Sequence, residues 1–172
     1  MEAFFQQVEP IQTQQILVDF ARKDRYAPLV VEVSRRIVAG VKAESQFLRA
    51  VSEVYAVQEW VRSHVKYVED PRGSEMTRSP LRILQAVERD GGTSGDCDDM
   101  AALVAAILES LGFEAMITIA SFRGRPAERA THVFCEVRGK GINNWVIVDP
   151  SLAPSVAREM IGNISQTKKA EV

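Results

Sequence analysis

The chain has 172 residues, of which 46% are hydrophobic and 26% are charged, and its formal net charge is −2. This length and composition predict one soluble globular domain with a sizeable core. The near-neutral charge supplies no basic field, which argues against a nucleic-acid partner, and no apolar stretch is long enough to span a bilayer.

The chain contains two cysteines, Cys97 and Cys135. Two cysteines do not make a disulfide framework, so folding in a reduced, intracellular compartment is the simplest interpretation. The first six residues lack a basic stretch followed by a long apolar core, and they therefore do not resemble a secretory signal. We expect a cytoplasmic protein.

The first part of the chain is helical in pattern. An apolar stripe begins at Ile16, after a polar run, residues 12–15, that we expect to be loose. Pro28 is placed to begin a second helix, for which Gly40 is a plausible C-terminal stop. Residues 44–64 carry apolar side chains at helical spacing and predict a third helix.

The middle of the chain predicts a strand, a loop and two further helices. Residues 65–68 favour a β-strand, and the loop after them leads to a helix with Ser79 as N-cap and Pro80 at its first position. A glycine-rich approach, residues 91–95, then leads into an apolar helix that begins around Cys97. Beyond this helix the apolar period changes from 3.6 to 2.

Residues 115–121, 131–137 and 144–149 alternate as strands do. Helices followed by an antiparallel sheet predict an α+β domain. The segment after Ser165 is polar, and we expect it to be disordered.

Cys97 is the most informative residue. It lies at the start of a predicted helix, and the chain then supplies His132 at the head of one strand and Asp149 at the end of another. A nucleophilic cysteine must lose a proton, an imidazole must accept it, and a carboxylate must hold that imidazole in the right tautomer. This order of residues therefore favours a catalytic site over a buried structural thiol.

The surroundings of Cys97 act on its thiol in opposite directions. A helix N-terminus favours the thiolate, whereas the flanking Asp96, Asp98 and Asp99, which are also good capping residues, disfavour it. An imidazolium from His132 is the group that would shift the balance towards thiolate.

The turn between the last two strands connects the other two residues. A tight hairpin centred between Lys140 and Gly141 would place His132 directly opposite Asp149, with Cβ atoms about 4.5–5.5 Å apart, although a bulge would shift this register. Alternation directs Cys135 to the opposite face from His132, as a small core residue.

Other candidate sites are weaker. His64 ends a predicted helix, and we expect a solvated or capping role for it. The acids around Cys97 lack the calcium-loop pattern, two histidines and two cysteines do not suit a closed zinc site, and the glycine run lacks the ending of a phosphate loop. No metal or cofactor is expected.

These features resemble the transglutaminase-like superfamily, which shares a papain-like Cys-His-Asp core, and in particular its small bacterial and phage members. The resemblance covers about residues 50–150, and its motifs are residues 60–62, 65–70, 95–99, 111–113, 132–134 and 145–150.

The resemblance implies that Cys97 is the nucleophile, His132 the general base and then acid, and Asp149 the orienting carboxylate. The implied reaction is acyl transfer through a thioester on a protein or peptide. The implied oxyanion site uses the Cys97 main-chain N–H and a second donor, which stays open; Tyr67 and Trp60 lie where family members keep an aromatic donor.

The resemblance also divides the chain into an N-terminal helical extension (1–45), a core (46–165) and a disordered tail (166–172). The extension is expected to cover the site or to serve as a docking arm. The alternative function is a catalytically silent structural or assembly protein of prophage origin, associated with a virion. An active site requires Cys97 to be exposed and more acidic than an ordinary thiol. The oligomeric state stays open.

Overall fold

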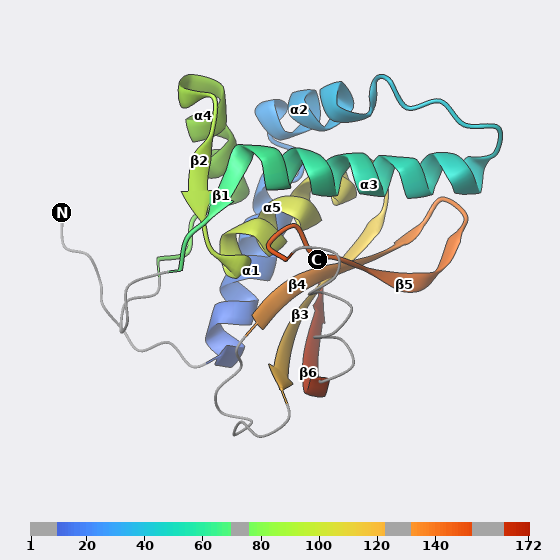
Figure 1. Ribbon diagram of the computed structural model, residues 1–172. Coiled ribbons are helices and arrows are strands. Elements are labelled where there is room, and N and C mark those ends of the chain that lie inside the picture. Colours follow the sequence, from blue (N-terminus) through green and yellow to red (C-terminus); the bar gives the residue numbers. More distant parts are fainter. Residues whose placement is uncertain (1–9, 70–75, 123–131, 153–163) are drawn as a thin grey trace.

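The computed structural model describes residues 10–69, 76–122, 132–152 and 164–172. At its centre lies helix α5 (Cys97–Ser110), which contacts four other helices and two strands of an antiparallel sheet (Figure 1). Every residue of α5 from Asp99 to Leu108 is buried. A helix that is apolar on all sides has to be enclosed, and the other elements of the domain enclose this one.

Four helices pack on α5, and three of them begin near the position that the sequence predicts, whereas the first begins earlier, at Pro10. They are α1 (Pro10–Asp24), α2 (Pro28–Val38), α3 (Gln46–His64) and α4 (Pro80–Asp90). Leu17 of α1 and Val30 of α2 belong to the same buried cluster as α5. The described part of the segment before residue 46 therefore packs as part of the core. No described helix is both long and apolar enough to cross a membrane.

The polar run at residues 12–15 is helical, so the expectation that it is loose is wrong. It forms part of α1, where Thr13 and Gln14 are buried. The Gln14 amide donates to the main-chain carbonyls of Ile117 at 2.8 Å and Lys168 at 3.0 Å. Buried polar side chains are tolerated where they find such partners.

The sheet has the strand order β5-β4-β3-β6, and each pair of neighbours is antiparallel. Its strands are β3 (Glu114–Phe122), β4 (His132–Gly139), β5 (Ile142–Val148) and β6 (Ile164–Glu171). The α+β class is confirmed. The expected disordered tail at 166–172 is wrong, because most of this segment belongs to β6, which pairs with β3 from Met116–Glu171 to Phe122–Ile164.

Two short strands form a separate parallel pair beside α5. The sequence predicts β1 (Val65–Tyr67), but it treats β2 (Thr93–Gly95) as part of a glycine-rich loop. Tyr67 pairs with Gly95, and the Val68 N–H donates to the Gly95 carbonyl at 2.9 Å. This pairing fixes the chain two residues before Cys97.

The N-terminus of α4 is capped from another helix. Ser79 occupies the N-cap position, as predicted, but its side chain makes no capping hydrogen bond. Asp24, at the end of α1, accepts instead from the Leu81 N–H at 2.9 Å through a buried carboxylate. One hydrogen bond thus joins the end of α1 to the start of α4.

Replacing Asp24 by alanine is expected to lower the free energy of unfolding by about 1 kcal/mol, because the Leu81 N–H loses its acceptor. Urea denaturation measures this. The matched control is Asp19→Ala on the same helix, since Asp19 is exposed and its carboxylate accepts from the side chain of the exposed Gln15. Equal destabilisation of the two variants would contradict the capping role.

Candidate active site

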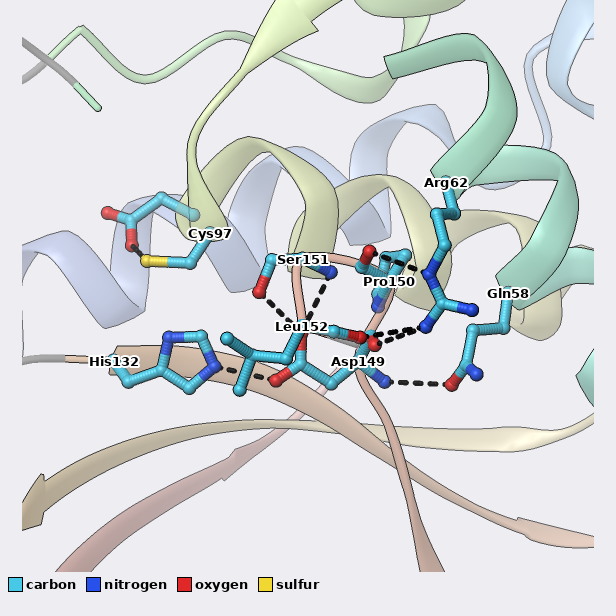
Figure 2. A network of polar contacts seen from close by, with 9 residues as sticks. Gln58, Arg62, Cys97, His132, Asp149, Pro150, Ser151 and Leu152 are labelled. Atoms are coloured by element: carbon cyan, nitrogen blue, oxygen red, sulfur yellow. Dashed lines mark hydrogen bonds and ion pairs between the residues drawn. The ribbon is translucent and has the colours of Figure 1, made fainter. Parts of the chain in front are cut away.

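The structure brings His132 and Asp149 together. His132 begins β4, Asp149 follows the end of β5, and the two side chains are 8% and 7% exposed. The His132 Nε2 lies 2.6 Å from the Asp149 Oδ2 (Figure 2). Since a carboxylate only accepts, Nε2 carries the hydrogen, and the neutral imidazole is left with an unprotonated Nδ1.

The register that produces this contact differs from the predicted one. Gly139 pairs with Ile142 across the expected tight turn, but Cys135 then pairs with Val148 because β5 holds a bulge of two extra residues. His132 is therefore not directly opposite Asp149, as the hairpin arithmetic predicts, but lies diagonally from it. A shift of two residues keeps both side chains on the same face of the sheet.

The other oxygen of the Asp149 carboxylate is held by its own chain. Oδ1 accepts from the Ser151 main-chain N–H at 3.0 Å and from the Ser151 hydroxyl at 2.6 Å. The carboxylate thus presents one saturated oxygen and one oxygen directed at His132 (Figure 2).

The sequence does not single out Ser151 or Gln58, and it indicates Arg62 only as part of the motif at residues 60–62, without a role. Gln58 and Arg62, both on α3, hold the main chain after β5. Polar side chains on an amphipathic helix usually indicate a solvated face, so the sequence offers no signal for these contacts.

Cys97 is the first residue of α5. The preceding Asp96 is the N-cap, and its carboxylate accepts from the Asp99 N–H at 3.1 Å, as the sequence predicts. The main chain of Val133, next to His132 in the chain, lowers the pKa of the Cys97 thiol. In Figure 2 the His132 Nδ1 is turned towards the side on which Cys97 lies.

The Cys97 thiol is neutral in this arrangement, contrary to the exposure and acidity that an active site was expected to show. The side chain is only partly exposed, and its sulfur lies 3.6 Å from the Asp98 Oδ1. Burial raises the pKa of Cys97 well above its ordinary value, and the negative charges of Asp98 and Asp96 raise it further. Burial, which the sequence did not reveal, is thus the largest cause of the raised pKa of Cys97, and the acids act in the direction anticipated from the sequence.

Asp99, in the first turn of α5, binds the segment before α4. Its buried carboxylate accepts from Arg78 through the main-chain N–H at 2.9 Å, Nε at 3.0 Å and Nη2 at 2.7 Å. Arg78 also donates to the Ser94 carbonyl. This ion pair fastens β2 and the first turn of α5 to the segment before α4.

Tyr67 lies close to the thiol. Partial burial raises the pKa of its hydroxyl to about 12, and the nearby Cys97 sulfur and the carboxylates of Glu69, Asp96 and Asp149 contribute to the shift. The hydroxyl therefore stays protonated and is able to donate a hydrogen bond near Cys97. Its side chain is 42% exposed, so this donor is accessible from solvent.

The remaining candidates from the sequence lie elsewhere. Cys135 is fully buried in the core, as predicted, and burial raises the pKa of its thiol. His64 is half-buried, and its ring stacks on Trp60 with centroids 4.4 Å apart. Within the described ranges no group of three or more histidine, cysteine, aspartate or glutamate side chains is arranged to hold a metal ion.

Asp98→Asn is expected to lower the pKa of Cys97, because it removes the negative charge nearest the sulfur. Each unit of decrease gives about tenfold more thiolate below the pKa, so alkylation at neutral pH becomes faster. The measurement is the rate of iodoacetamide alkylation of Cys97 against pH. Asp98→Glu, which keeps the charge, should leave the midpoint high; a midpoint unchanged in Asp98→Asn would contradict this electrostatic account.

Gly95→Ala is expected to destabilise the fold by about 1–3 kcal/mol through overpacking. A Cβ at Gly95 would lie 2.8 Å from the Asp99 Oδ2 and 2.9 Å from the Arg78 Nη2, so the ion pair would have to move. Gly40→Ala is the matched control, because a Cβ there meets nothing within 4 Å. Denaturant unfolding compares the two, and equal stabilities would contradict the close packing around Gly95.

Comparison with known proteins places this geometry in a family. A model of the transglutaminase-like superfamily matches residues 31–150, which is more than half of the chain and includes Cys97, His132 and Asp149. A search of curated proteins found no match.

Solved structures share the fold. A proposed cysteine protease from Cytophaga hutchinsonii superposes with a TM-score of 0.52 at 17% identity, covering 98% of this chain and 55% of that one. A proposed protease from Parabacteroides distasonis superposes with a TM-score of 0.53 at 9% identity, covering 88% of this chain and 34% of that one. The chain thus spans about half and about a third of these proteins. On its matched sequence and its fold, the chain belongs to the transglutaminase-like superfamily.

Proposed function

We propose that the protein is a cysteine-dependent acyl-transfer enzyme that acts on a protein or peptide. The observation that carries the proposal is the 2.6 Å contact between the His132 Nε2 and the Asp149 Oδ2, with Nδ1 left on the side of Cys97. An imidazole whose Nε2 is bound to a carboxylate has Nδ1 available as a base for a neighbouring thiol.

Because the thiol of Cys97 is neutral before the reaction, it has to lose its proton during attack, and His132 is the general base that accepts it. Nδ1 accepts the proton from Sγ as the sulfur forms a bond to the substrate carbonyl carbon. The carbon–nitrogen bond then breaks, and the departing amine or ammonia takes the proton from Nδ1. Water or a second amine attacks the resulting thioester and releases Cys97, with His132 again accepting and returning a proton.

The oxyanion that forms during attack requires hydrogen-bond donors. The Cys97 main-chain N–H is available at the first turn of α5, where the helix dipole also favours negative charge. The Tyr67 hydroxyl is the second donor in this proposal, since it is protonated, accessible and near the sulfur. Trp60 is less suitable because its ring is stacked on His64.

One observation favours the alternative of a catalytically silent binding protein. The Cys97 sulfur is partly covered and contacts Asp98, and its pKa is raised. A protein that uses the fold only for binding has no need of an acidic thiol. The two functions therefore differ in whether His132 activates Cys97.

Acylation of the thiol by p-nitrophenyl acetate tests the proposal, with the acetyl group located by mass spectrometry. We expect Cys97 to be acetylated in the wild-type protein, and His132→Ala to slow this step by about 100-fold or more, since a general base contributes at least that much. Asp149→Asn should slow it as well, because it favours the wrong imidazole tautomer.

Cys135 is the internal control in the same experiment, since its thiol is fully buried and donates to the Glu136 main-chain carbonyl. Equal acetylation of Cys97 in the wild type and His132→Ala would refute the general-base role and support the silent alternative.

A further inference from the structure

Two side chains of α3 hold the main chain that carries Asp149. Arg62 donates to three carbonyls: through Nε to Pro150 at 3.3 Å, and through Nη2 to Asp149 at 3.3 Å and Leu152 at 2.9 Å. One helical turn earlier, the Gln58 Oε1 accepts from the Asp149 N–H at 3.1 Å. Figure 2 shows both side chains reaching this segment from the same helix.

The segment needs such support because it lies beyond the sheet. The last pair of the β4–β5 ladder is Cys135–Val148, so Asp149 is the first residue without a strand neighbour. Main-chain groups outside a ladder require other partners, and here α3 supplies them. Arg62 is itself braced by Glu59 on the same helix.

We propose that Arg62 is a positioning residue that sets the orientation of the His132 ring through Asp149. This inference rests on the proposed function above. Arg62 fixes the carbonyls after β5, Gln58 fixes the Asp149 N–H, and Ser151 saturates one carboxylate oxygen. The other oxygen is then directed at the His132 Nε2, and the unprotonated nitrogen of the ring faces Cys97.

The guanidinium group suits this role better than an ammonium group. Its planar fork has five N–H donors in a fixed arrangement, so one side chain is able to bind several carbonyls and a carboxylate together. A lysine at position 62 would keep the charge but would not reproduce bonds from two nitrogens to three carbonyls. Arg62→Lys therefore removes this arrangement of hydrogen bonds and keeps the positive charge.

If Arg62 had only a structural role, its replacement would lower the stability of the protein without changing the tautomer of His132. The decisive measurement is therefore the tautomer of neutral His132, observed by nitrogen NMR and assigned with the His132→Ala variant. In the wild type we expect the proton on Nε2. In Arg62→Lys we expect a mixture of tautomers, and acylation of Cys97 by p-nitrophenyl acetate slower by about 10- to 100-fold, as for a small misplacement of a catalytic group.

Arg22→Lys is the matched control. Arg22 also donates to a main-chain carbonyl, that of Glu171 at 3.1 Å, but it lies on α1 and is exposed. We expect neither the tautomer nor the acylation rate to change in this variant. Gln58→Met replaces Arg62→Lys in the test if Arg62→Lys does not fold. It removes the acceptor for the Asp149 N–H with a side chain of similar size, and we expect it to shift the tautomer of His132 in the same direction.

The outcomes separate the two proposals. A folded Arg62→Lys protein, or Gln58→Met in its place, with the wild-type tautomer and acylation rate would overturn the positioning role and leave the proposed function intact. Wild-type acylation no faster than that of His132→Ala would instead overturn the proposed function. The tautomer measurement would still report whether α3 orients His132.

Discussion

The enclosure of α5 is the constraint on which the rest of this structure depends. Its residues from Asp99 to Leu108 have no exposed face, so helices must cover one side and the sheet the other. Only the two ends of such a helix are free to carry polar groups. A reactive side chain at the first turn is therefore compatible with a helix whose middle is buried. Because the buried part of the helix is held on all sides, it also fixes the position of Cys97.

The pairing of His132 with Asp149 could be predicted from the sequence, but its register could not. The turn lies where the sequence places it, between Gly139 and Ile142. The register shift in β5 has no signal in the sequence, and at the shift the Arg138 guanidinium lies 4.6 Å from the centre of the Trp145 ring. The pairing survives the bulge because two extra residues preserve the alternation of side chains, whereas one would have turned Asp149 to the other face.

The three acids around Cys97 look like one cluster in the sequence and have three separate functions in the structure. Asp96 caps the helix, Asp99 binds Arg78, and Asp98 faces the thiol. Capping could be predicted from residue type and position. The partner of Asp99 could not, since Arg78 is distant in the chain, and the contacts of Gln58 and Arg62 with the segment after β5 escaped the sequence for the same reason.

Strand β6 has a consequence for how the protein behaves in solution. Hydropathy alone missed it because its side chains are polar, and it is held by main-chain pairing with β3. It occupies one edge of the sheet, and Thr167, Lys168 and Lys169 are exposed on it. The neighbouring β3 is largely apolar, and without β6 it would be an exposed edge strand able to pair with another chain. Charged side chains on an outer strand disfavour pairing with the strand of a second molecule, so Lys168 and Lys169 disfavour extension of the sheet at β6.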